Sequence, residues 1–432
     1  MDINQSTAVG NVDAIESLLG QAAVGDPNQN PGVNDIKNHV LLVHGDLGTG
    51  ERVENFQESR SIEKTSCLRF QFVVFVMGLF HLQMACIDAI WRILLKPKNS
   101  QIDPDCLLER VGVLHPKQTV KISKNPKFRQ MHNIVLQDGI ASRLDVWRVV
   151  AAKQNTAHSS LKAFAESKPS WSTILAMSKQ LPKEYVASGN FSARRRKPDE
   201  ERDKVHENAL LKNRYYLLYE ELIYGMNNGD IGRVENCFIP WIFIFKATGK
   251  NKYASHMTRF LLDLNYVFPE SLRKAIRMNW LGNPSGKPGK YRGNDWIMEL
   301  NNFYTKACYG GRYSNRSVKR ILEESPLIEV YRKLLTKFEE MFYISGRTIL
   351  HAPTLIKNMI LKLLGKIDEN QPHVFEKGRD VEYSAPDSVK EGVMLMSKFF
   401  DDVAAGEAFE GGDDGNEMDD LDTDDLVNCV SE

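Results

Sequence analysis

The 432-residue sequence has few cysteines, and their spacing excludes the common cysteine-based sites. The six cysteines stand at positions 67, 86, 106, 237, 308 and 429 and form no C-x-x-C pair. Zinc sites and redox motifs need closely spaced ligands, so neither is expected here. We therefore predict reduced thiols in an intracellular compartment, the nucleus or the cytoplasm.

The sequence also lacks a long apolar run and a secretory signal. The longest apolar runs, Phe72–Phe80 and Cys237–Phe245, have nine residues each, whereas a membrane-spanning helix needs roughly 20. The N-terminal stretch MDINQSTAVG has neither a basic start nor an apolar segment, unlike a signal peptide. Both runs are predicted to be buried core elements, and no membrane partner is expected.

Net charge is absent as well, because 56 basic residues balance 56 acidic ones. Residues 401–432, however, hold thirteen Asp or Glu and no Lys or Arg, so subtracting −13 from 0 leaves +13 on residues 1–400. A basic body favours a polyanionic partner such as DNA, and an acidic tail could compete for the same surface. The alternative is a solvated, disordered tail on an ordinary globular body.

What the sequence does contain is a mixture of strand and helix patterns, which predicts the α/β class. His39–His44 and Leu68–Val76 are apolar and β-prone, His81–Leu95 has helical spacing, and helical patterns dominate 207–280. A small sheet with a large, mainly helical insertion follows from this order. The predicted parts are a disordered leader (1–36), the N-terminal half of the core (37–135), the helical insertion (136–285), C-terminal helices that complete the core (286–400) and a disordered acidic tail (401–432).

Two motifs near the predicted strands could carry chemistry. Asp46 follows the first strand in VHGD, where α/β folds place ligand-facing groups, although Gly-Asp is also ordinary turn and helix-capping chemistry. His81 and Asp88 are seven residues apart and share one face of a helix. They could face the same cleft as Asp46. Alternatively, they are a core-edge histidine and a surface carboxylate.

A third motif, NDWIMELNN at 294–302, places acids on a later helix. Asp295, Glu299 and Asn302 follow i, i+4, i+7 spacing and share a face, which suits a hard cation such as Mg²⁺. Asp295 could instead be an N-cap, leaving Glu299 as the inward acid.

Two basic stretches could contact phosphate. The preceding loop KPGKYRG at 287–293 supplies Lys287, Lys290 and Arg292, and RRRK stands at 194–197. The loop is alternatively a flexible hinge. The RRRK run is alternatively a nuclear address or a solvated face.

These segments resemble a known family. The stretches VHGDLGTGERV (43–53), MGLFHLQMACIDAIW (77–91), YLLYEELIYGMNNGDIGRVENC (216–237), GKNKYASHMTRFLLDL (249–264) and GNDWIMELNNFYTK (293–306) are similar to an uncharacterised fungal domain family. That family is related to DDE transposases, whose catalytic domain is RNase H-like. The likeness runs over most of residues 38–340 and implies a small RNase H-like sheet.

The resemblance also implies roles for particular residues. Asp46 looks like the first acid of the triad and Glu299 like the last, with His81 lining the cleft. The family pattern places the second acid directly before an aromatic-His pair, where this chain has Leu79. Asp88, two turns along the helix, or Asp230 in the Gly229-Asp230 turn could substitute for it, although neither position matches the family pattern. Two-metal phosphoryl transfer needs several carboxylates, and leucine cannot ligate a cation.

The sequence therefore predicts a transposase-derived, nucleic-acid-binding protein whose metal-dependent DNA strand cleavage is lost or degraded. Any surviving activity would use Mg²⁺ or Mn²⁺ held by Asp46, Glu299 and Asp88, and otherwise no cofactor is expected. The alternative is a non-catalytic helical interaction or scaffold protein. The first reading expects Asp46 and Glu299 in one cleft beside His81, with Lys287, Lys290 and Arg292 at its rim.

Overall fold

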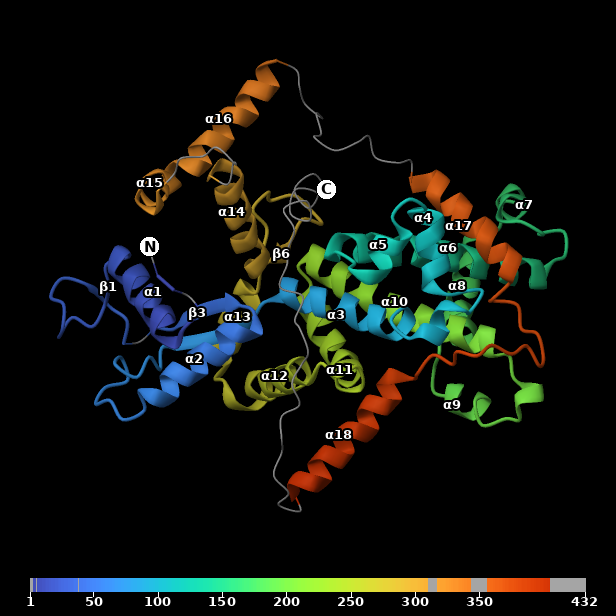
Figure 1. The fold of residues 1–432 in the computed structure, drawn as a ribbon, viewed down its shortest axis with the longest axis horizontal. Coiled ribbons are helices and arrows are strands. Elements are labelled where there is room, and N and C mark those ends of the chain that lie inside the picture. Colours follow the sequence, from blue (N-terminus) through green and yellow to red (C-terminus); the bar gives the residue numbers. More distant parts are fainter. Residues whose placement is uncertain (1–2, 5, 38, 310–316, 343–355, 405–432) are drawn as a thin grey trace.

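The chain folds into a mostly helical structure, with 67% of the computed structural model in helices (Figure 1). The structure describes residues 3–4, 6–37, 39–309, 317–342 and 356–404. Within these ranges the strands form three two-stranded pairs, and two of the pairs have strands of only two residues. The α/β prediction thus holds in the coarse sense that short strands accompany many helices. An RNase H-like sheet is not seen in this part of the chain, because the segments after the second long strand form helices.

The N-terminal part contains the one pair of five-residue strands among the described residues. β3 and β4 are parallel and in register from Leu41 opposite Val73 to Gly45 opposite Met77. Each strand runs directly into a helix, which is the connection that parallel strands require. The elements here are α1 (Ala8–Gln21), β1 (Val24–Gly25), β2 (Asn34–Asp35), β3 (Leu41–Gly45), α2 (Leu47–Ser59), β4 (Val73–Met77) and α3 (Leu79–Leu94).

The predicted leader contains the amphipathic helix α1, which packs on the strand pair. Val12 and Ile15 of α1 are buried in an apolar cluster with Val53, Phe56 and Val73. Thr7 caps the helix by accepting a hydrogen bond from the backbone N–H of Gly10.

The middle of the chain forms a helical body around α3 (Figure 1). Nearly every side chain of α3 is buried, since the helix contacts α6, α10, α11 and α14 on different sides. Its elements are α4 (Leu107–Leu114), α5 (Thr119–Lys124), α6 (Phe128–Gln154), α7 (Leu161–Glu166), α8 (Trp171–Tyr185), α9 (Phe191–Arg194), α10 (Lys204–Asn228), α11 (Ile231–Ala247), α12 (Asn251–Leu262) and α13 (Glu270–Asn279), with short 3-10 turns at Lys98–Gln101 and Asp199–Glu201 and a π-helical turn at Asp263–Val267.

The last part returns to both halves of the molecule. α14 (Asn294–Tyr309) follows the small pair β5 (Leu281–Gly282) and β6 (Arg292–Gly293) and packs against α3 and β3. α17 (Ile356–Asn370) lies on α6, and α18 (Ser388–Ala404) lies on α11. Between α14 and α17 in the chain, α15 (Val318–Glu324), a 3-10 turn (Ser325–Leu327) and α16 (Ile328–Met341) project from the body (Figure 1).

Two composition-based expectations can be compared with these elements. Cys67, Cys86, Cys106 and Cys237 are free thiols, as predicted, while the side chains of Cys308 and Cys429 lie outside the description. Among the helices that the structure describes, none combines the length and the apolar content that a bilayer-spanning segment needs.

Candidate functional site

The carboxyl ends of β3 and β4 bring two helix N-termini to one edge of the strand pair. The backbone N–H of Gly78, after β4, donates to the Gly45 carbonyl at the end of β3 over 2.8 Å. Asp46 directly follows and caps α2, with its Oδ1 accepting from the Thr49 N–H at 2.7 Å. Burial acts against this carboxylate, but the hydrogen bonds from Thr49 and the charges of His81 and Arg52 hold the pKa of Asp46 below its usual value.

The N-terminus of α3 is capped from far away in the sequence, by Asp295 at the start of α14. The Asp295 carboxylate accepts from the backbone N–H of Phe80 at 3.0 and 3.1 Å, and from the backbone N–H of His81 at 3.0 Å. It also accepts from His81 Nδ1 at 2.9 Å. The capping alternative for Asp295 is therefore close to what is seen, except that the capped helix is α3 rather than its own.

Two glycines make room for this buried carboxylate. A Cβ on Gly78 would overlap Asp295 Oδ2 and lie 2.7 Å from the Gly45 carbonyl oxygen. A Cβ on Gly293 would lie 2.5 Å from Asp295 Oδ1 and 3.0 Å from the Phe80 nitrogen. The absence of a side chain at Gly78 and Gly293 therefore lets the Asp295 carboxylate of α14 reach the backbone N–H groups of α3.

His81 is the residue on which the acids of the site act together. Burial disfavours its charged form, but the hydrogen bond and charge of Asp295, and the charges of Asp46 and Glu299, raise the pKa of His81. Because the folded-state pKa is raised, the His81–Asp295 pair adds stability that is fully present below the ordinary pKa of 6.5. That stability is lost as the pH rises through the raised value.

We expect the His81 imidazole to titrate above pH 6.5 in the wild-type protein and below it in Asp295→Asn. The variant removes the charge and the charged acceptor, while burial, which lowers the pKa, remains. An NMR titration of the imidazole Cε1–H signal measures both values. Glu299→Gln is the control and should lower the pKa by a smaller amount. An unchanged His81 pKa in Asp295→Asn would contradict this electrostatic account.

His44 is a site residue that the sequence patterns did not single out. It stands at the end of β3, and its buried Nδ1 has no hydrogen-bond partner among the described residues. Burial lowers its pKa, against the attraction of the Asp295 charge. The sequence signal for His44 is its position directly before the Gly45-Asp46 turn, where the motif points first to Asp46.

Asp88, the third predicted metal ligand, lies instead in a cluster of cations. Its carboxylate is 2.8 Å from Arg92 Nε, 3.0 Å from Lys250 Nζ and 3.6 Å from Lys96 Nζ. Burial opposes ionisation, but these three positive charges hold the pKa of Asp88 below its usual value. A metal ion at Asp88 would have to displace ammonium and guanidinium groups that already neutralise it.

The residues at the strand ends do not fit the two-metal chemistry that the resemblance implies. Leu79, at the expected place of the second acid, is fully buried in the core. Both oxygens of Asp295 already accept hydrogen bonds, and one oxygen of Asp46 caps α2. Within the described residues no three His, Cys, Asp or Glu side chains are grouped closely enough to hold a metal ion.

A chain of aromatic rings leads from His81 to a basic region. Ring centroids are 5.9 Å apart for His81 and Phe80, 5.5 Å for Phe80 and Phe128, and 5.8 Å for Phe128 and His132. Burial and the charges of Arg129 and Arg292 lower the pKa of His132 to about 3. His132 is thus neutral at physiological pH, and one arginine from each of two separate basic segments acts on it.

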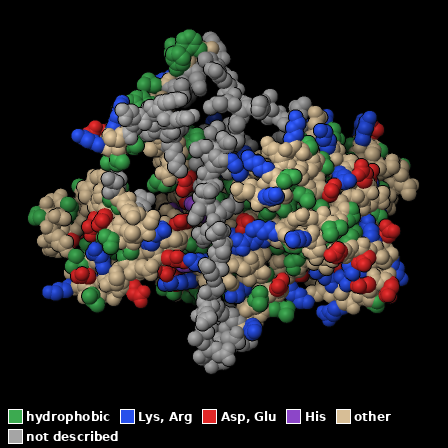
Figure 2. Space-filling model, in the orientation of Figure 1, with side chains coloured by type: hydrophobic (Ala, Val, Ile, Leu, Met, Phe, Trp, Pro, Cys, Tyr) green, Lys and Arg blue, Asp and Glu red, His purple; other side chains and the backbone are tan. Residues whose placement is uncertain are grey.

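One of these segments contains the predicted rim, and the other spans residues 117–129. Arg292 donates to Asn227 Oδ1 at 2.9 Å and lies 5.9 Å from the Trp296 ring, while Lys287 is exposed in the β5–β6 loop. The second segment, 117–129, contains five basic residues, and no Asp or Glu occurs between Glu109 and Asp138. Figure 2 shows Lys and Arg side chains over the upper part of the helical body, where α5 lies. We call the following residues the basic strip: Lys117, Lys121, Lys124, Lys287, Lys290 and Arg292.

Comparison with known proteins gives one result. The model of a family of unknown function (DUF6589) matches residues 1–351, a range that includes the strand pair, the basic strip and α14. No curated protein and no solved structure matches the chain. The predicted resemblance is thereby confirmed at the level of a domain family of unknown function, and its fungal and transposase parts stay predictions.

Proposed function

Since the chain belongs to the family of unknown function DUF6589, we propose its function from the site: it is a nucleic-acid-binding protein, derived from a DDE transposase, that has lost metal-dependent strand cleavage. The observation that carries the binding function is the pair of acid-free basic segments, 117–129 and 287–293, whose residues Arg129 and Arg292 both act electrostatically on His132. Phosphate backbones are bound by such convergent Lys and Arg side chains.

The loss of cleavage is supported by the way in which the acids are used. A parallel strand pair with acids at its carboxyl end is consistent with an RNase H-like ancestor. Here, however, Asp295 is committed to the α3 amides and His81, and Leu79 is buried. The carboxylates stabilise the fold, so the proposed protein binds its nucleic acid without cutting it.

Replacing Lys121 and Lys124 by alanine is expected to weaken binding to a duplex DNA by about tenfold, because two phosphate contacts are lost. The slope of log K against log salt should fall by about 2. Fluorescence anisotropy of a labelled duplex measures both quantities. Both lysines are exposed, so the variant should keep the fold.

The matched control is the double variant Lys162→Ala and Lys319→Ala, which removes the same charge from two exposed lysines that pair with Glu166 and Glu323. Equal affinity losses in the two double variants would show that binding does not use the basic strip. Mg²⁺ or Mn²⁺ is then added to the bound duplex, and no cleavage is expected. Cleavage abolished by Asp46→Asn would overturn the proposed loss of catalysis.

A second candidate, a helical interaction protein, is favoured by one specific observation. The projecting helix α16 carries apolar side chains that are between 48% and 74% exposed: Val330, Tyr331, Leu334, Phe338 and Met341. Exposed apolar faces of this kind mark interaction sites. Failure of the protein to bind duplex DNA at low salt would leave this second function as the better account.

A further inference from the structure

A cavity lies at the other end of the helical body from the strand ends. It has a volume of about 360 Å³, within the range of small-molecule sites. Its walls come from the C-terminal ends of α6 and α8, from α9, from the start of α10 and from the segment after α17. The RRRK run at 194–197, which the strand-end site does not use, contributes two of its lining residues.

Aromatic rings form one wall of this cavity. Tyr185 and His206 have ring centroids 6.2 Å apart, and His206 and Phe375 have centroids 5.9 Å apart, both in edge-to-face geometry. Phe375 is 55% exposed, although aromatic rings of this size are normally buried. An exposed ring beside a cavity is available to stack on a planar ligand.

His206 gives this wall a hydrogen-bond acceptor. Its Nδ1 lies 2.9 Å from the Pro372 carbonyl oxygen, which can only accept, so Nδ1 carries the hydrogen and Nε2 has a free electron pair. Burial, together with the charges of His373 and Arg194, outweighs its contacts with Pro372 and Asp203 and lowers the pKa of His206 to about 4. The ring is therefore neutral at physiological pH and can accept from an N–H or O–H group.

Cationic side chains form the rim. Four basic and three acidic residues line the cavity, and Arg202 and Glu207 neutralise each other through two hydrogen bonds of 3.0 and 2.7 Å. Three cations then face two acids. Arg194 and Lys197 are exposed, and neither makes an ion pair within the part of the chain that the structure describes. A phosphate group would find its counter-charges there.

A buried polar network holds the floor of the cavity in place. His373 Nδ1 lies 2.7 Å from Asp145 Oδ2, and His373 Nε2 lies 3.1 Å from Ser142 Oγ. These distances are those of a nucleophilic triad, but Ser142 is buried in the middle of α6 and its hydroxyl donates to Asn213 Oδ1 at 2.6 Å. The network therefore positions His373 as part of the wall and supplies no accessible nucleophile.

We propose that this cavity binds a nucleotide. The base stacks on Phe375 beside Tyr185, a hydrogen of the base or sugar is accepted by His206 Nε2, and the phosphate lies between Arg194 and Lys197. Stacking on an aromatic ring together with a cationic phosphate contact is how proteins hold single nucleotides without sequence readout. The nucleotide is either free or part of an unpaired strand.

The test uses the full chain and isothermal titration calorimetry with 5′-AMP, adenosine and inorganic phosphate. Saturable binding of 5′-AMP is expected, with adenosine and phosphate each at least about tenfold weaker, because each lacks one half of the recognised group. Phe375→Ala and Arg194→Glu should each weaken 5′-AMP binding by about tenfold. Both side chains are exposed, so these variants should fold.

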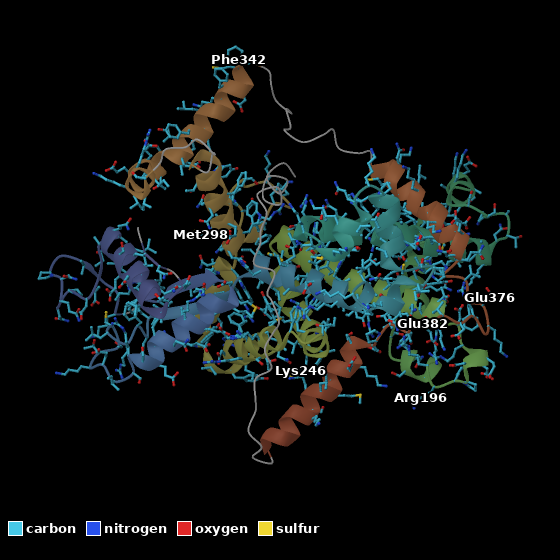
Figure 3. All side chains as sticks on the ribbon, viewed as in Figure 1. Arg196, Lys246, Met298, Phe342, Glu376 and Glu382 are labelled. Carbon is cyan, nitrogen blue, oxygen red and sulfur yellow. The ribbon has the colours of Figure 1, made fainter. Side chains whose placement is uncertain are left out.

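Arg196→Glu is the matched control, since Arg196 belongs to the same basic run but does not line the cavity; it is labelled at the lower right in Figure 3. Equal losses in Arg194→Glu and Arg196→Glu would overturn the proposal. A short single-stranded oligonucleotide that binds more tightly than 5′-AMP, and loses affinity in the same variants, identifies the strand as the source. If neither probe binds at millimolar concentration, the cavity is not a nucleotide site. Duplex binding through Lys121 and Lys124 is measured separately, so failure of one proposal leaves the other standing.

Discussion

Asp295→Ala should lower the free energy of unfolding by about 3–5 kcal/mol, the cost of removing one partner from a buried charged contact. The variant would leave the backbone N–H groups of Phe80 and His81, and the His81 Nδ1–H, without their acceptor. Asp295 is 4% exposed, so water cannot readily replace the carboxylate. Urea unfolding followed by circular dichroism measures the loss.

Asp230→Ala is the control for this prediction. Asp230 also caps a helix, α11, by accepting from the Arg233 N–H at 3.2 Å, but its side chain is half exposed. Its removal should cost only about 0.5–2 kcal/mol. If the two variants lost the same amount of stability, the Asp295 carboxylate would be an ordinary cap with no special part in the fold.

Gly392→Ala is expected to destabilise the protein by about 1–3 kcal/mol, although alanine is the better helix former. Gly392 stands where α18 crosses α11, and a Cβ there would overlap the Phe243 carbonyl oxygen. The two backbones would have to separate, which loosens α18. Hydrogen exchange of the α18 amides should become faster, and thermal unfolding should occur at a lower temperature.

Gly365→Ala is expected to change the stability in the opposite direction. Gly365 lies in α17, and a Cβ at this position meets no atom within 4 Å. Alanine should therefore stabilise that helix by roughly 0.5–1 kcal/mol through its lower conformational entropy in the unfolded chain. A stabilising effect of both substitutions would mean that α18 does not depend on the close approach at Gly392.

Local patterns predicted the elements of the site well. The strand His39–His44 is observed as Leu41–Gly45, and the helix His81–Leu95 as Leu79–Leu94. In both cases a run of apolar residues bounded by glycine defines the element. The predicted strand Leu68–Val76 agrees less well with the structure, because β4 begins only at Val73. The residues before it form turns that place Phe70 in the core.

Long-range contacts were beyond these patterns. No residue near Asp295 in the sequence indicates that its carboxylate oxygens accept hydrogen bonds from the backbone N–H groups of residues 80 and 81. Helical spacing correctly placed Asp295 and Glu299 on α14. Spacing cannot tell, however, which of the two carboxylates accepts hydrogen bonds from another helix. Asp88 was misleading for the same reason, since Lys250 reaches it from a distant helix start.

The capping of α3 by Asp295 also determines when, during synthesis of the chain, the N-terminus of α3 gains its hydrogen-bond acceptor. The contact spans 215 residues, and a ribosome that adds about 5–20 residues each second needs roughly 10–40 seconds to cover that distance. For that interval the first turn of α3, a helix that is almost wholly buried in the folded protein, has no acceptor for its amides. The cap of α3 is therefore complete only after α14 has been made, and we expect truncation before position 295 to leave a nascent segment prone to aggregate.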